Sequence, residues 1–325
     1  MNQRTAFLTG GSGFLGRNLI GYLRERGYQV RALARSESAS ATVSAAGAEP
    51  VRGDLDQDDA LRAGMAGCAL VLHSAALAEE FGAPADFHRV NVVGTERVLA
   101  AARAAAVPRL VHVSTEAVLL GGPPIVNADE SWPLPAHPIG LYAASKGQAE
   151  LRVRAANCAE LATLIIRPRL IWGQGDTSVL PRIVAAVRRG EFAWIGGGRH
   201  LTSSCHVTNV CEGALLCAER GRPGETYFLT DGPPQPMREL LTSLLRTQGV
   251  EPGDRSLPRP LAYAAAALLE WGATTLGVPK VPPVTRMGAR LIGEEVTVND
   301  AKARRELGYA AQVSRAAGLR AMTVA

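Results

Sequence analysis

Lysine, aromatic residues and cysteine are all scarce in this sequence. Three of the 35 basic residues are lysines, aromatic residues make up 5% of the chain, and the five cysteines include no Cys-x-x-Cys spacing. An odd number of cysteines without that spacing argues against a disulfide framework and a zinc site, and favours free thiols in a reducing compartment. The arginines are scattered with no basic run, so the net charge of +5 does not indicate a nucleic-acid surface. We therefore expect neither a metal nor a nucleic acid as a partner.

The sequence also shows no signal peptide, since Met1 leads almost directly into a strand-like segment. We expect a cytoplasmic protein. What is present is a chain of 325 residues that is 47% hydrophobic and 20% charged. Such a chain can bury a large core, which excludes intrinsic disorder and small disulfide scaffolds.

Short apolar runs alternate with helical patterns through the first half of the chain. The predicted strands are 5–9, 29–33, 49–52, 70–73, 110–113 and 161–167, and the predicted helices are 14–26, 56–65, 86–105 and 142–156. This alternation with short connections predicts a parallel α/β sheet with helices on both faces. After residue 167, glycine-rich and proline-rich stretches separate shorter helices, which favours a smaller lobe over the edge of the sheet.

A glycine-rich loop joins the first predicted strand to the first predicted helix. Gly10, Gly13 and Gly16 allow a tight turn, close approach of the backbone to a pyrophosphate, and tight packing of the helix on the strand. The N-terminus of that helix offers unpaired N–H groups and partial positive charge to phosphates. We therefore predict a Rossmann-type, doubly wound α/β fold with a dinucleotide-binding domain at 1–172. A smaller α/β substrate lobe is predicted at 173–325, of which 205–230 returns partly to the sheet.

The end of the second strand bears on the choice of nicotinamide cofactor. No carboxylate occurs there before Glu37, whereas Arg35 is placed to pair with a 2′-phosphate. This favours NADP(H), with NAD(H) left open. The alternative is that Arg35 is an ordinary solvated arginine in an arginine-rich protein.

Tyr142 and Lys146 are four residues apart on one predicted helix, so their side chains share a face. An ammonium group near a phenol favours the phenolate, and we expect Lys146 to lower the pKa of Tyr142 toward neutrality. Ser114 and Thr115 end the fifth strand, which places their hydroxyls at the carboxyl edge of the sheet, where ligands bind. The alternative for the Tyr–Lys pair is an ordinary amphipathic helix end.

Seven motifs in order make the sequence resemble the extended short-chain dehydrogenase/reductase superfamily. They are Thr9–Gly16, Gly53–Leu55, His73–Ala76, Asn91–Thr95, Ser114–Thr115, Tyr142–Lys146 and Arg167–Pro168. Further stretches in the second half, including 164–173, 205–210 and 301–309, are similar to the 3β-hydroxysteroid dehydrogenase branch. That branch includes bacterial 2-alkyl-3-oxoalkanoate reductases, which resemble residues 167–173 closely.

The resemblance implies a division of labour among these residues. Tyr142 would be the general acid/base, Lys146 would hold the ribose hydroxyls, and Thr115 would hydrogen-bond the substrate oxygen. Asp54 and Leu55 would contact adenine. The complete predicted cofactor site is Gly10, Ser12, Gly13, Phe14, Leu15, Gly16, Arg35, Asp54, Leu55, Ala75, Ala76, Asn91, Ser114, Tyr142, Lys146 and Pro168.

The segment 260–277 is rich in alanine and leucine, and Glu270 is its one charged residue. It is shorter than the roughly 20 apolar residues that span a bilayer. Three readings remain open for it: a helix covering an apolar substrate pocket, a helix lying at a membrane surface, and a plain core helix.

The function predicted from these features is NAD(P)-dependent hydride transfer between an apolar secondary alcohol and its ketone, as in 3β-hydroxysteroid dehydrogenases. The substrate would be a steroid or a long-chain β-keto acid, and the second case corresponds to 2-alkyl-3-oxoalkanoate reduction. Two further alternatives are a nucleotide-sugar epimerase or dehydratase and a non-enzymatic NADP(H)-sensing protein. Dimerisation through two helices of the cofactor domain is common in the superfamily, so a homodimer is compatible with the resemblance.

Overall fold

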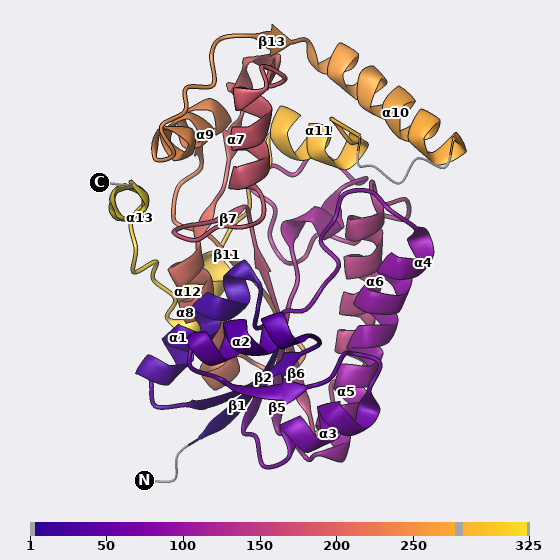
Figure 1. The fold of residues 1–325 in the computed structure, drawn as a ribbon, viewed down its shortest axis with the longest axis vertical. Coiled ribbons are helices and arrows are strands. Elements are labelled where there is room, and N and C mark those ends of the chain that lie inside the picture. The colour runs from indigo at the N-terminus through magenta and orange to yellow at the C-terminus, as the bar shows by residue number, and fades with distance from the viewer. Residues whose placement is uncertain (1–3, 277–281, 324–325) are drawn as a thin grey trace.

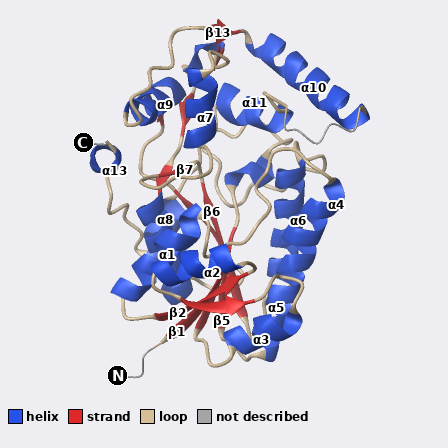
Figure 2. Cartoon of the chain, viewed as in Figure 1, coloured by secondary structure: helices blue, strands red, loops and turns tan. Residues whose placement is uncertain are grey.

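A computed structural model describes residues 4–276 and 282–323 of the chain. Strands of the main sheet are β1 (Thr5–Thr9), β2 (Gln29–Ala34), β3 (Glu49–Arg52), β4 (Leu70–His73), β5 (Arg109–Val113), β6 (Ala162–Pro168) and β11 (Thr226–Leu229). Within the described residues these seven strands form one parallel sheet in the order β11-β6-β5-β4-β1-β2-β3 (Figures 1 and 2). The predicted doubly wound parallel sheet is confirmed.

Helices cover both faces of this sheet and bury its apolar side chains. One face carries α1 (Phe14–Glu25), α2 (Glu37–Ala45), α8 (Val207–Arg220) and α12 (Ala301–Leu307). The other carries α3 (Asp58–Met65), α5 (Gly94–Ala104) and α6 (Leu141–Ala155). The sequence analysis missed α2, a short helix whose N-terminus is capped by the Ser36 hydroxyl. Because strands covered on both faces need apolar residues on both sides, they read as short continuous apolar runs.

The helix predicted over 86–105 is divided into three parts. It begins with α4 (Pro84–Phe87), widens into a π-helical turn at His88–Val93, and continues as α5. Such wide turns are often found at functional sites. Here the turn carries Asn91, whose side chain is buried.

The second lobe lies beyond the carboxyl ends of the strands (Figure 1). Its helices are α7 (Leu180–Arg188), α9 (Met237–Arg246), α10 (Arg259–Thr275), α11 (Arg286–Gly293) and α13 (Arg315–Met322). Three two-stranded pairs connect them: β7 (Ile171–Trp172) with β10 (Cys205–His206), β8 (Trp194–Ile195) with β13 (Ser256–Leu257), and β9 (Leu201–Thr202) with β12 (Gln235–Pro236). The domain boundary at residues 172 and 173 stays a prediction, although α8 and β11 lie on the main sheet.

None of the described helices is long and apolar enough to cross a membrane. The apolar segment 260–277, for which three readings were left open, lies mostly in α10, and Gly277 is outside the described residues.

Candidate functional site

The strand order reverses between β1 and β4, and the loops that follow these two strands border a groove. A groove opens at such a switch point because neighbouring connections run to opposite faces of the sheet. This one has a volume of about 520 Å³. Its two sides touch at the base, since a Cβ added to Gly10 would lie 2.7 Å from the backbone nitrogen of Ala75.

Many of the predicted cofactor residues line this groove. They are Gly10, Ser12, Gly13, Arg35, Asp54, Leu55, Ala75 and Ala76. The groove is also bordered by residues that the sequence analysis did not predict, namely Leu33, Ala39, Gly53, Asp56, Ser74, Arg89, Val90, Val93, Gly94 and Arg97. The π-helical turn and the start of α5 supply the last five, so this wall could not be inferred from the glycine loop alone.

The glycine loop fits a dinucleotide for reasons that differ among its glycines. Gly16 is needed for packing, because an added Cβ would lie 2.0 Å from the Gly10 carbonyl oxygen. Gly13 is different: an added Cβ would meet the same oxygen at 3.4 Å, an ordinary contact. Gly13 is also the N-cap of α1, whose first turn has neither a side-chain cap nor an acidic residue. Room at Gly13 and uncapped N–H groups suit a bound pyrophosphate.

Phe14 and Leu15 begin α1 and are buried, so they position the helix behind the groove. Asn91 does not line the groove. Its Nδ2 donates hydrogen bonds to the Leu77 carbonyl (3.0 Å) and to Ser145 Oγ (2.9 Å), and its Oδ1 accepts one from the Leu77 N–H (2.7 Å). Asn91 thus joins the loop after β4 to α6 next to Lys146.

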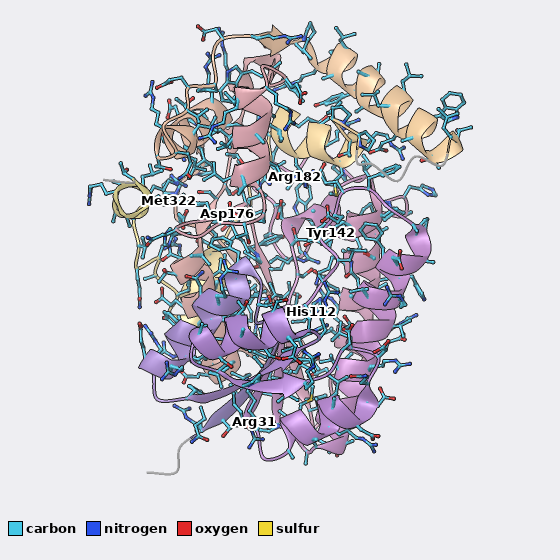
Figure 3. All side chains as sticks on the ribbon, in the orientation of Figure 1. Arg31, His112, Tyr142, Asp176, Arg182 and Met322 are labelled. Atoms are coloured by element: carbon cyan, nitrogen blue, oxygen red, sulfur yellow. The ribbon has the colours of Figure 1, made fainter. Side chains whose placement is uncertain are left out.

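Tyr142 lies at the start of α6, at the edge of a largely apolar cluster (Figure 3). The cluster contains Ala117, Val118, Leu119, Leu120, Phe228, Met287 and Leu291, among others. Met287 belongs to α11 and fills the space beside Gly140. A Cβ added to Gly140 would lie 2.9 Å from the Cβ of Met287. The second lobe therefore places an apolar wall against the start of α6, where Tyr142 lies.

The pKa of Tyr142 differs from our expectation. Burial raises the pKa of this phenol above its usual value of 10, and the Glu116 carboxylate raises it further, while the Thr115 hydroxyl acts in the opposite direction. Lys146 is not among the groups that shift it. The prediction that Lys146 lowers the pKa of Tyr142 is wrong for this structure, and Tyr142 carries its proton at neutral pH.

Lys146 is turned toward the sheet. Its Nζ donates hydrogen bonds to His112 Nε2 (2.8 Å) and to the Val113 carbonyl (2.7 Å), and the side chain is 2% exposed. Burial lowers the pKa of Lys146 to about 7, with the Glu150 carboxylate opposing this shift. Burial also holds the pKa of His112 well below its usual range, so the ring is neutral and can accept this hydrogen bond.

Ser114 directly follows β5, and Pro168 ends the neighbouring strand β6. Both residues are buried next to this centre. The Ser114 hydroxyl has no hydrogen-bond partner among the residues that the structure describes. A buried hydroxyl without a partner is costly. It therefore fits a site that a polar ligand completes.

The sequence analysis missed two buried ion pairs near Tyr142 and Lys146. Arg169 Nη1 lies 2.9 Å from Glu116 Oε1, and Arg167 binds Glu150 through two hydrogen bonds of 2.8 and 2.6 Å. All four side chains are at most 4% exposed. The two arginines flanking Pro168 were the available signal, because a buried strand can hold arginine only with carboxylate partners.

A second groove of about 680 Å³ lies between the loop 173–176, α7 and Met322. It contains none of the predicted site residues, and Figure 3 shows Asp176 and Met322 apart from Tyr142. No group of three or more potential metal ligands occurs among the described residues. His206 caps α8, since its Nδ1 accepts a hydrogen bond from the Thr208 N–H.

Several known proteins are similar to this chain in sequence and in fold. The chain is 53% identical to the 4-hydroxy-2-methyl-3-oxo-4-farnesyl-3,4-dihydroquinoline-1-oxide ketoreductase of Stigmatella aurantiaca, over 97% of this chain and 95% of that protein. It is 38% identical to the 2-alkyl-3-oxoalkanoate reductase of Stenotrophomonas maltophilia, over 96% of each. A dTDP-glucose 4,6-dehydratase of Streptomyces venezuelae, solved with NAD, superposes with a TM-score of 0.76 at 27% identity over 98% of this chain and 95% of that one.

The sequence matches the 3-beta hydroxysteroid dehydrogenase/isomerase family over residues 7–259. This match covers most of the chain, and the groove with its glycine loop and Tyr142–Lys146 pair agrees with it. The chain belongs to the 3-beta hydroxysteroid dehydrogenase/isomerase family and is an NAD(P)-dependent oxidoreductase.

Proposed function

We propose that the protein uses NADPH to reduce a ketone whose neighbouring carbon carries a long apolar substituent. The observation that carries this proposal is the setting of Tyr142, a protonated phenol bordered by an apolar cluster from both lobes. The names of the two relatives point the same way, since each places an oxo group next to a carbon that bears a farnesyl or alkyl chain.

NADPH held by the groove would supply the hydride that reduces the carbonyl carbon. Tyr142 donates its proton to the carbonyl oxygen, which yields the secondary alcohol. The resulting phenolate then takes up a proton, and Lys146, one helical turn away with a pKa of about 7, is suited to supply it. Ser114 offers a hydroxyl that has no partner among the described residues, whereas the Thr115 hydroxyl donates its proton to Glu116 and so does not bind the substrate oxygen as the sequence analysis expected.

The preference for NADPH rests on Arg35. Its side chain is exposed at the end of β2, lines the groove, and forms no ion pair with any described residue. The N-terminus of α2 and the Ser36 and Ser38 hydroxyls follow it directly. A cation beside a helix N-terminus suits a 2′-phosphate.

The test is NADPH oxidation by purified protein with three ketones: a 3-ketosteroid, a long-chain 2-alkyl-3-oxo acid and a farnesylated 3-oxoquinoline. We expect turnover of at least one, and a loss of about two to four orders of magnitude in Tyr142→Phe. That variant should still bind NADPH, which can be measured by fluorescence.

Turnover that Tyr142→Phe leaves unchanged would refute the role of Tyr142. Inactivity toward all three ketones, together with conversion of a nucleotide sugar, would refute the proposed substrate class. That result would leave the family and the cofactor groove as they stand.

A further inference from the structure

His112 is a fully buried histidine on β5, between the apolar residues Val111 and Val113 (Figure 3). Its Nε2 lies 2.8 Å from the Lys146 amine, which also donates to the Val113 carbonyl at 2.7 Å. Its Nδ1 is buried and has no hydrogen-bond partner among the described residues. A buried nitrogen without a partner lowers stability, and an apolar residue at this position would avoid that cost. The contact with Lys146 is what a histidine offers here and an apolar residue does not.

The neighbouring imidazole of His73 is hydrogen-bonded in a different way. His73 lies opposite His112 on β4, with the ring centroids 5.1 Å apart. The Thr95 hydroxyl donates its own proton to the Asn91 carbonyl, so it accepts one from His73 Nε2 at 2.9 Å. His73 Nδ1 then accepts from the Thr9 hydroxyl at 2.7 Å. Two threonines therefore satisfy both nitrogens of His73, whereas only Nε2 of His112 has a partner among the described residues.

The hydrogen bond between His112 and Lys146 favours the charged form of the amine. Burial holds the pKa of His112 well below its usual range, and Lys146 and His73 act in the same direction, so the ring is neutral. An acceptor that is neutral stabilises an ammonium group more than an amine, because the ammonium group is the stronger donor. Burial of Lys146 opposes this effect and lowers its pKa to about 7. Without the His112 acceptor, the pKa of Lys146 should fall further.

Among the residues that the structure describes, His112 is the one side chain hydrogen-bonded to the amine. Glu150 raises the pKa of Lys146 from the next turn of α6, and it is itself paired with Arg167 on β6. Other charged residues on the elements packed against α6 pair with one another, including Asp86 with Arg89, Glu96 with Arg152, and Glu116 with Arg169. His88, on the π-helical turn, is exposed.

We propose that His112 is a positioning residue of the reaction centre, which holds the Lys146 amine through Nε2 and keeps it protonated close to neutral pH. An ammonium group has three N–H donors, so two serve His112 and Val113 and one is left for a ligand. The amine is thus fixed in place while it keeps a proton to give. The consequence for turnover rests on the proposed function, in which Lys146 returns a proton to the Tyr142 phenolate.

The first test measures the pKa of Lys146 in the cofactor-free protein. The chain has three lysines, Lys146, Lys280 and Lys302, so NMR of protein labelled with carbon-13 lysine gives three ε-carbon signals. Lys146→Met identifies the signal of interest. We expect it to titrate near pH 7 in the wild type, and about one to two pH units lower in His112→Phe. His112→Gln supplies an amide oxygen as acceptor and should titrate closer to the wild type.

The matched control is His73→Gln, because His73 is equally buried on the adjacent strand and its hydrogen bonds go to threonines. It should leave the titration of Lys146 unchanged, and circular dichroism should show that every variant is folded. An unchanged or higher pKa of Lys146 in His112→Phe would overturn the proposal. So would an equal shift in His73→Gln, or a His112→Gln value as low as that of His112→Phe.

A measurement on the wild-type protein needs no substitution at His112. Nitrogen-15 NMR of the imidazoles reports which ring nitrogen carries the proton, and below pH 7 we expect it on Nδ1 of His112. A proton on Nε2 contradicts the proposal, because that nitrogen cannot then accept from the Lys146 ammonium group.

Activity distinguishes this role from a merely structural one. In the proposed reaction Lys146 must be protonated, so the alkaline decline of kcat/KM should begin at a lower pH in His112→Phe than in the wild type. A structural defect would instead lower kcat/KM by the same factor at every pH and leave the Lys146 titration near pH 7, which would overturn the proposal. If the titration shifts as expected but the pH profile does not, His112 holds Lys146 as proposed, and the proton transfer from Lys146 to Tyr142 is refuted.

Discussion

Thr115 Oγ1 donates a hydrogen bond to Glu116 Oε2 at 2.9 Å, and the other oxygen of that carboxylate is held by Arg169. A hydroxyl carries one proton, so Thr115 cannot donate to a substrate carbonyl while this bond is formed. Tyr142 is then the available proton donor, and Glu116 acts on both hydroxyls at once. It engages the proton of Thr115 and raises the pKa of Tyr142.

Replacing Glu116 with glutamine should lower the pKa of Tyr142, because it removes a negative charge that disfavours the phenolate. The amide oxygen can still accept from Thr115. The phenolate of Tyr142 should therefore form at a lower pH in Glu116→Gln. Ultraviolet absorbance during an alkaline titration, with Tyr142→Phe as the reference for the other tyrosines, measures this shift.

The control for this change is Glu150→Gln, which removes an equally buried carboxylate that is also paired with arginine. Glu150 is not among the groups that shift the pKa of Tyr142. Its variant should leave the titration of Tyr142 where it is, although it lowers the pKa of Lys146. An equal shift in both variants, or none in Glu116→Gln, would contradict the role assigned to Glu116.

Gly13→Ala and Gly16→Ala should have opposite consequences although both lie in the same loop. Alanine at Gly13 meets an ordinary contact of 3.4 Å, so thermal stability should change little while NADPH affinity falls by an order of magnitude or more. Alanine at Gly16 would lie 2.0 Å from a carbonyl oxygen, so the protein should lose stability. Thermal melting and NADPH titration distinguish the two, and equal melting temperatures in both variants would refute the assignment.

Much of the fold could be predicted because local rules dominate in the first half. The apolar runs Thr5–Thr9 and Leu70–His73 became strands with the predicted bounds, since strands covered on both faces have a simple pattern. The helix α2 was missed because its alanine and serine residues have little amphipathic pattern, and Val43 is its one buried side chain.

The candidate site was only partly predictable for a different reason. Motif positions located Tyr142 and Lys146, but the pKa of each depends on burial and on charges brought from elsewhere in the chain. Glu116 reaches Arg169 across 53 residues, and Lys146 reaches His112 across 34. Such contacts follow from the sheet order, in which His73 and His112 lie side by side, and not from spacing along one helix.

Arg35→Ala should reduce the affinity for NADPH by roughly 10- to 100-fold and leave that for NADH nearly unchanged, because only NADPH carries a 2′-phosphate. Titration of both cofactors by fluorescence measures the two constants. Arg52→Ala is the matched control: Arg52 is exposed at the end of the neighbouring strand β3 but is paired with Glu37. Equal loss for NADPH and NADH in Arg35→Ala, or tighter binding of NADH than NADPH by the wild-type protein, would contradict the proposed preference.

Lys146 should make the stability of the cofactor-free protein depend on pH. Its pKa is about 7 in the folded protein against a usual value of 10.5, so between these values the unfolded chain binds one more proton than the folded one. The titration of Lys146 therefore increases the free energy of unfolding as the pH rises from about 7 toward 10. Any advantage in melting temperature of Lys146→Met over the wild type should shrink over that range, by the equivalent of about 3 to 4 kcal/mol. The control is Lys302→Met, which removes a lysine paired with Glu225 and should shift the melting temperature by a similar amount at every pH in this range. If Lys146→Met also shifts the melting temperature by the same amount at every pH, Lys146 stays charged in the folded protein and the prediction is wrong.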